Sequence, residues 1–268
     1  MFYQAKNGQV QIGEQVMEYI SFGKGARKLI MLPGLGDGLK TAKGMAIPFA
    51  LLYRQFAKDF TVYVCSRKNN LPEGYTIAQM AKDQAEAMEK LGMDCADIIG
   101  VSQGGAIAQE LALTYPDKVG KLILVVTFAG QNTTLQTLME KWIEMARKEE
   151  YAKLMIDNFE NSYSEGYLKK YRMFYPIITK IGKPRSFDRF IIQAQSILTH
   201  NARERLAEIF HPTLIVGGRQ DKIVTVEESL QMAETIPNSE LYIYEDFGHG
   251  LYEEGKDFIP RVLEFLKN

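Results

Sequence analysis

Residues 100–104 read Gly-Val-Ser-Gln-Gly, and a further glycine, Gly105, follows them. The largely apolar run 96–99 precedes this stretch, and residues 106–113 after it combine strong helix formers with apolar helical spacing. We therefore expect a strand, an abrupt turn at Ser102 and a helix, which is the context of a Gly-x-Ser-x-Gly nucleophile elbow. Glycines two residues to either side suit such a turn, because Cβ atoms at those positions would clash.

A turn of this kind exposes the Ser102 hydroxyl at the carboxyl edge of a sheet, above a helix N-terminus whose free amides favour developing negative charge. The letters alone are a weak signal, and the competing interpretation is a tight strand-to-helix turn with a capping serine. The strand before the serine and the helix after it favour the nucleophile interpretation.

Length and charge limit the classes of protein to which the chain can belong. A chain of 268 residues is long enough for one α/β domain with an inserted subdomain and a sizeable core. Its 32 Lys and Arg residues against 33 Asp and Glu residues, with no long run of one sign, leave no electrostatic footprint for nucleic acid. The N-terminus lacks a signal-peptide pattern and no apolar stretch approaches the roughly 18 residues of a membrane span, so we expect a cytoplasmic protein without a membrane partner. Composition leaves the oligomeric state open.

Cysteines and histidines are few in this chain. Cys65 and Cys95 lie beside apolar strand-like segments and form no Cys-x-x-Cys pair, so we expect reduced, half-buried thiols and no disulfide. The three histidines, His200, His211 and His249, are too scattered for a metal-ligand signature. We therefore expect neither a metal nor a cofactor.

Strand and helix patterns alternate along the first half of the chain. Polar and apolar residues alternate over 9–12 and 15–20 between glycines, which predicts an edge hairpin. Further strands are predicted over 28–32, 60–65 and 119–127, and further helices over 46–56 and 76–91. This alternation predicts an α/β fold: a mostly parallel eight-stranded sheet with right-handed crossovers and helices on both faces.

The glycine-rich loop 33–38, Pro-Gly-Leu-Gly-Asp-Gly, follows an apolar strand and invites a comparison with phosphate-binding loops. Leu39 stands where a dinucleotide fingerprint needs its third glycine, and the residues that follow do not complete a Walker motif. We instead expect an oxyanion loop, in which the backbone amide of Leu35 faces Ser102 and the amide of Gln103 is the second donor.

The alternation stops between residues 131 and 206. Helical periodicity over 135–145, 151–158, 167–174 and 187–198, without a convincing strand between these segments, predicts an inserted helical cap over the carboxyl edge of the sheet. The division expected is an α/β core of residues 1–130 and 207–268 and a cap of residues 131–206. Because ligand pockets are mainly apolar and aromatic, the expected substrate-binding residues are Gly34, Phe128, Trp142 and Tyr171.

The alternation resumes with a strand over 213–218, a helix over 226–236, a strand over 240–244 and a final helix over 257–266. Asp221 follows the first of these strands, and His249, between two glycines, follows the second. Both loops fall on the same edge of a parallel sheet as Ser102. A serine hydroxyl needs a base within hydrogen-bond reach and a group that orients the base, and His249 and Asp221 are the catalytic candidates.

Each candidate has a competing interpretation. His249 as a turn residue, and Asp221 as a turn acid or a helix cap, are the structural alternatives. Asp246 is the nearest competing acid by sequence, but it lies only three residues before His249 on the same loop. His200 and His211 are expected at a helix end and before a strand, packed or solvated on the surface.

Four stretches of this chain together resemble the α/β-hydrolase superfamily: 32–36 (Leu-Pro-Gly-Leu-Gly), 100–105, 217–224 (Gly-Gly-Arg-Gln-Asp-Lys-Ile-Val) and 248–249 (Gly-His). The resemblance covers essentially the whole length. It is greatest to the single-helical-cap group, which contains small serine esterases, lactonases, C–C bond hydrolases and cofactor-free perhydrolases. Many members have His-Gly at the oxyanion loop where this chain has Pro33 and Gly34, so the support that this histidine normally gives the loop is absent.

The resemblance and the candidate residues together imply acyl transfer to water by a Ser-His-Asp triad. The expected function is therefore that of a serine hydrolase that cleaves a small carboxylic ester through an acyl-enzyme, with a small-molecule substrate as its partner. Two alternatives stay open. One is a C–C bond hydrolase of a dicarbonyl substrate, and the other is a small-molecule receptor or signalling protein that retains the triad.

Overall fold

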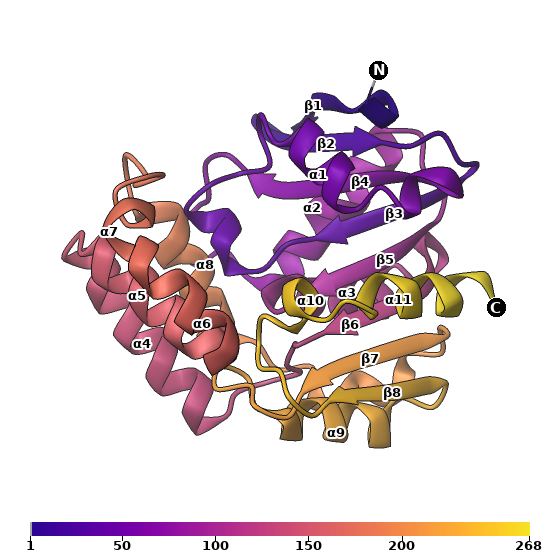
Figure 1. The fold of residues 1–268 in the computed structure, drawn as a ribbon. Coiled ribbons are helices and arrows are strands. Elements are labelled where there is room, and N and C mark those ends of the chain that lie inside the picture. Colours follow the sequence, from indigo (N-terminus) through magenta and orange to yellow (C-terminus); the bar gives the residue numbers. More distant parts are fainter. Residues whose placement is uncertain (1) are drawn as a thin grey trace.

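An eight-stranded sheet runs through the centre of the molecule, in the strand order β1-β2-β4-β3-β5-β6-β7-β8 (Figure 1). The computed structural model describes residues 2–268. The strands are β1 (Lys6–Ile12), β2 (Gln15–Phe22), β3 (Arg27–Leu32), β4 (Phe60–Lys68), β5 (Ala96–Val101), β6 (Val119–Val125), β7 (Thr213–Gly218) and β8 (Ser239–Tyr244). β2 pairs antiparallel with β1 and β4, and the other neighbours are parallel. The mostly parallel eight-stranded sheet expected from the sequence is confirmed.

The hairpin at the N-terminal edge of the sheet follows from its alternating pattern. Ile12 pairs with Gln15, so a two-residue turn joins the strands, and Gly13 in this turn has a φ of 54°. Glycine adopts a positive φ without the strain that a side chain would add. Val10 and Ile12 are buried, while Gln11 between them is exposed, as a strand with one solvated face requires.

Helices cover both faces of the sheet (Figure 1). One layer holds α2 (Ile77–Lys90), α3 (Gln103–Thr114) and α9 (Val226–Thr235), and the other holds α1 (Ala46–Leu52), α10 (Leu251–Glu254) and α11 (Phe258–Lys267). Consecutive residues of β6 serve both layers: Leu122 and Leu124 pack into the first, and Ile123 and Val125 pack into the second. A strand buried on both faces is expected to be continuously apolar, and the last four residues of β6 are all apolar.

Five α-helices of the described chain lie between β6 and β7 and group together beside the sheet (Figure 1). They are α4 (Thr133–Arg147), α5 (Tyr151–Ser162), α6 (Glu165–Tyr171), α7 (Tyr175–Ile178) and α8 (Asp188–Thr199). We call this group the insertion; the division of the chain into core and cap at residues 131 and 206 stays a prediction. Within residues 2–268, no helix combines the length and the apolar character needed to cross a membrane.

Several elements end elsewhere than the sequence predicts: β6 stops at Val125 rather than at residue 127, and α5 continues to Ser162 rather than residue 158. β4 continues to Lys68 rather than ending at residue 65, because the polar residues Ser66 and Arg67 are buried and find hydrogen-bond partners inside the protein. α1 ends at Leu52 rather than near residue 56, and a short 3₁₀ turn, Phe56–Lys58, leads into β4.

The two cysteines are free thiols in different surroundings. Cys65 is buried in β4, and Cys95 is exposed immediately before β5. Burial raises the pKa of the Cys65 thiol to about 12. The two cysteines are free, but the expectation that both would be half-buried is wrong: one thiol is fully enclosed and the other is accessible.

Candidate active site

Ser102 lies at the turn between β5 and α3, with φ 52° and ψ −121°. This conformation is strained for a residue with a side chain, at a cost of about 1–3 kcal/mol, and such strain is concentrated at functional sites. The neighbouring glycines make the turn possible. A Cβ on Gly100 would lie 2.5 Å from the Gly104 carbonyl oxygen, and a Cβ on Gly104 would lie 2.0 Å from the Leu32 carbonyl oxygen.

The backbone of Ser102 is anchored to the neighbouring strand. Its N–H donates to the Val125 carbonyl oxygen at 2.9 Å, and its own carbonyl oxygen accepts from the Thr127 hydroxyl at 2.6 Å. Gly105 approaches the same threonine so closely that a Cβ there would lie 2.4 Å from Thr127 Oγ1. These contacts hold the serine in its strained conformation.

His249 and Asp221 lie side by side after β8 and β7. His249 Nδ1 is 2.8 Å from Asp221 Oδ2, and both side chains are buried. The second carboxylate oxygen, Oδ1, accepts from the backbone N–H groups of Ile223 at 2.8 Å and Val224 at 3.1 Å. Because an ionised carboxylate only accepts hydrogen bonds, a neutral imidazole beside it carries its proton on Nδ1 and leaves Nε2 as an acceptor.

The residues that compete with this pair lie elsewhere. Asp246 is exposed, and His211 is half-buried. His200 ends α8 as expected, but it is buried rather than placed on the surface, because its ring packs edge-on against Phe128. Burial lowers the pKa of His200 to about 4, so this ring is neutral at pH 7. Within residues 2–268, no group of three or more His, Cys, Asp or Glu side chains is arranged to hold a metal ion.

A cavity of about 450 Å³ opens beside Ser102, between the sheet edge and the insertion. Five of the residues expected from the sequence line it: Ser102, His249, Gly34, Leu35 and Trp142. Asp221 stands behind this wall, against His249. The structure therefore brings the candidate nucleophile, the candidate base and one aromatic residue of the insertion to a single cavity.

Phe128 and Tyr171, which the sequence analysis assigned to substrate binding, do not line this cavity. Phe128 is fully buried and packs against His200, with ring centroids 6.0 Å apart. Tyr171 is 37% exposed and stacks on Tyr167, with ring centroids 4.3 Å apart, in a row of aromatic rings on the insertion. Aromatic content predicts that a pocket exists. It does not show whether a loop residue such as Phe128 packs into the core, or which way the helix that carries Tyr171 is rotated.

Among the cavity residues that the sequence analysis did not assign are Tyr252 and Glu253, which follow His249 by three and four positions. The Tyr163 hydroxyl, also in the cavity wall, donates to Glu253 Oε2 at 2.7 Å. Burial raises the pKa of the Glu253 carboxyl from its ordinary value. The available signal was their position: α10 begins directly after the histidine loop, so its first residues lie close to His249.

Two backbone amides near Ser102 begin helical turns. The loop 33–38 passes directly beside the serine, since a Cβ on Gly34 would lie 3.3 Å from the Ser102 Cβ. Leu35 begins the 3₁₀ turn η2 (Leu35–Gly38), and Gln103 begins α3. The first N–H groups of a helix have no acceptor within that helix, so these two amides are suited to a negative charge at Ser102.

Comparisons of the sequence and of the structure with known proteins both find hydrolases. A family model described as the alpha/beta hydrolase fold matches residues 29–256. A 2-hydroxy-6-oxononadienedioate/2-hydroxy-6-oxononatrienedioate hydrolase of Pseudomonas putida is 27% identical, over 94% of this chain and 92% of that protein.

Two solved structures share the fold. An alpha/beta hydrolase enzyme from a Medee basin deep-sea metagenome library has a TM-score of 0.86 at 21% identity, and the match covers 97% of this chain and 98% of that chain. The enol-lactonase of Burkholderia xenovorans has a TM-score of 0.82 at 18% identity, with 97% of this chain and all of that chain covered.

Proposed function

The chain belongs to the alpha/beta hydrolase fold family and is a hydrolase, and we propose that it cleaves small carboxylic esters through an acyl-enzyme on Ser102. The observation that carries this proposal is the 2.8 Å contact between His249 Nδ1 and Asp221 Oδ2 at a cavity that Ser102 also lines. These residues supply the three roles that acyl transfer needs: a nucleophile, a base and a group that orients the base. The fold alone would not support the proposal, because one fold hosts many functions.

In the first half-reaction, Ser102 Oγ attacks the ester carbonyl carbon while His249 Nε2 takes the hydroxyl proton. The carbonyl π electrons move to the carbonyl oxygen, which becomes the oxyanion of a tetrahedral intermediate. Asp221 accepts the hydrogen bond from the His249 Nδ1–H and stabilises the imidazolium formed on His249. Collapse of the intermediate breaks the bond to the alcohol oxygen, and the alcohol leaves with the proton from His249.

The N–H groups of Leu35 and Gln103 are the proposed donors to the oxyanion. Their positions are fixed before the reaction begins, so they stabilise developing charge without reorganisation. A single donor of this kind contributes about 3 kcal/mol to transition-state stabilisation in comparable sites.

In the second half-reaction, water takes the place of the alcohol. His249 Nε2 removes a proton from the water, whose oxygen attacks the acyl carbon and forms a second tetrahedral intermediate. Its collapse breaks the bond to Ser102 Oγ, which regains a proton from His249, and the carboxylic acid leaves. The products hold all the atoms of the ester and one water.

The size and lining of the cavity support a small, largely apolar substrate. About 450 Å³ falls in the lower part of the range for small-molecule sites, and Trp142, Met139 and Leu154 provide apolar walls. Three Asp, Glu or Lys side chains line the cavity: Lys40, Glu253 and Asp37, of which Asp37 is paired with Arg189. A single lysine beside two acidic side chains suits a neutral ester better than a molecule with two negative charges.

A C–C bond hydrolase is the second candidate, and the relative from Pseudomonas putida is the observation that favours it. The name of that protein specifies a dienedioate, which carries two carboxylates. Lys40 offers one positive charge in the cavity here, and Glu253 would repel a second carboxylate. We therefore rank ester hydrolysis first.

The test is hydrolysis of a p-nitrophenyl ester series of increasing acyl length by the wild type and by Ser102→Ala. We expect kcat/KM to be highest for short acyl chains and turnover to vanish in the variant. A folded wild type that leaves every ester intact and cleaves a 2-hydroxy-6-oxo-dienoate would replace the ester proposal with C–C hydrolysis.

A further inference from the structure

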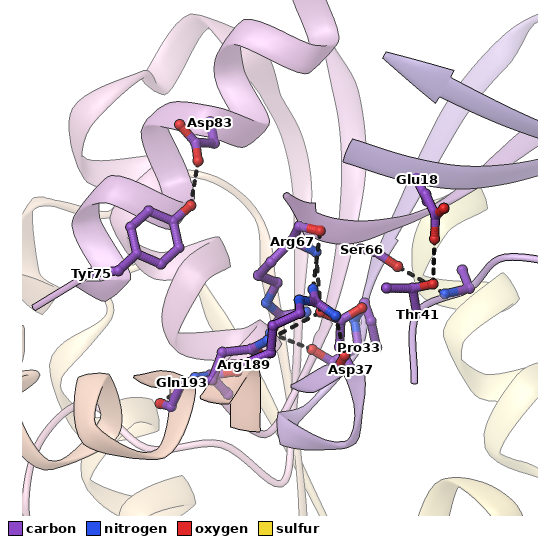
Figure 2. A network of polar contacts seen from close by, with 12 residues as sticks. Glu18, Pro33, Asp37, Thr41, Ser66, Arg67, Tyr75, Asp83, Arg189 and Gln193 are labelled. Carbon is purple, nitrogen blue, oxygen red and sulfur yellow. Dashed lines mark hydrogen bonds and ion pairs between the residues drawn. The ribbon is translucent and has the colours of Figure 1, made fainter. Parts of the chain in front are cut away.

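Arg67 is a buried cation near the end of β4, beside the loop that carries Leu35 (Figure 2). Only 1% of this residue is exposed. Moving a guanidinium from water into a protein interior is strongly unfavourable unless hydrogen bonds and charges compensate for it. The partners of Arg67 therefore indicate what its burial serves.

The Arg67 side chain joins the two segments that carry the proposed oxyanion donors. Its Nη2 donates to the Pro33 carbonyl oxygen at 2.7 Å and to Gln103 Oε1 at 3.0 Å. Leu35, two residues after Pro33, and Gln103 itself carry the N–H groups assigned to the oxyanion. Within residues 2–268, the Nε and Nη1 groups have no hydrogen-bond partner, so the guanidinium bonds only to these two segments.

The Gln103 side chain is held from its other end as well. Its Nε2 donates to the Gln193 carbonyl oxygen at 2.8 Å and to the Ser196 hydroxyl at 3.1 Å, both on α8. The amide is thus clamped between Arg67 and the insertion, and the residue is fully buried. These bonds fix both ends of the Gln103 side-chain amide and so restrict movement of the first turn of α3, which carries its backbone N–H.

Asp37 fixes the same loop from within. Its Oδ2 accepts from the Arg67 backbone N–H at 3.2 Å and from Arg189 Nη2 at 2.9 Å, while Arg189 Nη1 donates to the Asp37 carbonyl oxygen at 2.9 Å. Figure 2 shows the three side chains gathered in one cluster. Burial lowers the pKa of Arg67, and the Asp37 carboxylate opposes this effect. Two guanidinium groups and one carboxylate leave the cluster with a formal charge of one positive unit, and Arg67 bonds directly to the two segments that carry the proposed oxyanion donors.

We propose that Arg67 is a positioning residue that sets the separation of the Leu35 and Gln103 amides, an inference that rests on the serine-hydrolase function proposed above. Pro33 has neither an N–H nor a polar side chain, so its carbonyl oxygen is the one group of this residue that can hydrogen-bond to Arg67. Oxyanion donors act only over a narrow range of distances, and a displacement of about 1 Å in an active site can lower the rate about 100-fold.

The experiment compares Arg67→Met, Arg67→Lys and Gln103→Met with the wild type. Gln103→Met keeps the backbone N–H and removes only the side-chain clamp. Lys68→Met is the matched control, because Lys68 is the next residue of β4, pairs with Asp83 at 3.0 Å and does not line the cavity. The readouts are kcat and KM for the best p-nitrophenyl ester, and the affinities for a boronic acid and for the carboxylic acid product.

In Arg67→Met we expect kcat to fall about 10- to 100-fold while KM changes less than about 3-fold. Affinity for the boronic acid, which forms a tetrahedral adduct on Ser102, falls by a similar factor, and affinity for the product stays within about 3-fold. Arg67→Lys, which keeps the charge with a shorter reach, and Gln103→Met lose about 3- to 10-fold in kcat. Lys68→Met keeps both kcat and boronic acid affinity, whatever its stability.

A folded Arg67→Met variant with wild-type kcat and boronic acid affinity would overturn the inference. If that variant does not fold by circular dichroism, Arg67→Lys and Gln103→Met decide the question through the same readouts. A wild type that cleaves no ester would overturn the ester proposal but not the role of Arg67. The rate at which a fluorophosphonate labels Ser102 would still depend on the Leu35 and Gln103 amides. In that event slower labelling in the Arg67 variants supports the inference, and an unchanged rate contradicts it.

Discussion

The carboxyl edge of the sheet and the insertion face each other across one cavity, but they are built differently. At the sheet edge, backbone hydrogen bonds and close glycine contacts fix Ser102, and two backbone amides fix the Asp221 carboxylate. The insertion supplies apolar wall residues such as Trp142 through side-chain packing, and it leaves Tyr171 partly exposed. Groups proposed for the chemistry are thus located by the backbone, and the substrate wall is located by side chains. We expect substitutions to affect rate at the first region and selectivity at the second.

The largest effect is expected for Ser102→Ala. Loss of the nucleophile lowers kcat by at least about 10⁵-fold, while the strained turn is retained because the residues around it are unchanged. Active-site titration of the wild type, steady-state kinetics of both proteins and thermal unfolding measure this. A folded variant with more than about 1% of wild-type activity would remove Ser102 from the proposed mechanism.

Asp221→Asn comes next. The asparagine amide can donate to His249 Nδ1 and so favour the wrong tautomer, and we expect kcat to fall about 10⁴-fold with little change in KM. Asp246→Asn is the matched control, because Asp246 follows β8 on the histidine loop but is exposed. It should keep kcat within about 2-fold. A larger loss in the control than in Asp221→Asn would reverse the assignment of the acid.

His200 directly follows α8, and its substitution tests how burial of this ring affects stability at low pH. Its pKa of about 4 in the folded protein lies below the ordinary 6.5, so the unfolded chain binds more protons between these pH values. The stability contributed by the neutral ring is therefore complete above pH 6.5 and is lost as the pH falls towards 4, by up to about 3 kcal/mol. Urea unfolding at pH 7 and pH 4.5 should show a smaller acid-induced loss in His200→Gln than in the wild type. Equal losses would show that another group governs acid sensitivity.

The smallest effect is expected within the insertion, where Trp142→Ala and Tyr171→Ala form a pair. Trp142 lines the cavity and is 3% exposed, so its truncation enlarges the cavity. We expect the ratio of kcat/KM for long acyl chains to kcat/KM for short ones to rise about 10-fold. Tyr171→Ala should leave the chain-length preference within about 2-fold. The ester series given above measures both, and equal shifts in the two variants would show that the substrate site extends to Tyr171.

Much of this architecture could be predicted because it depends on local patterns. Apolar runs and turn residues were enough to predict the sheet, the helices and the loops that carry Ser102, Asp221 and His249, since parallel strands bring their carboxyl ends to one edge. The rotation of a helix about its axis and the direction in which a loop side chain points depend on packing against distant residues. Tyr171 on α6 and Phe128 in the loop after β6 were misplaced for these reasons.

Arg67 shows most clearly what the sequence conceals. The run Ser-Arg-Lys after an apolar strand is typical of a solvated loop, yet Ser66 and Arg67 are buried inside β4. Their acceptors and donors come from segments tens of residues away: Pro33 lies 34 positions before Arg67, and Gln103 lies 36 positions after it. Only the folded chain brings these groups together, so no periodicity could reveal the arginine's partners.

The two thiols also make the protein easy to attach to other materials. Cys95 stands directly before β5 and Ser102 directly after it, so the length of the strand separates them by about 23 Å at roughly 3.3 Å per residue. Burial raises the pKa of the Cys65 thiol to about 12 and encloses it, whereas burial and Asp97 raise the pKa of the exposed Cys95 thiol less, so a maleimide dye or linker should react preferentially at Cys95. A protein immobilised through this one handle would present its cavity away from the support, in a uniform orientation and without any substitution.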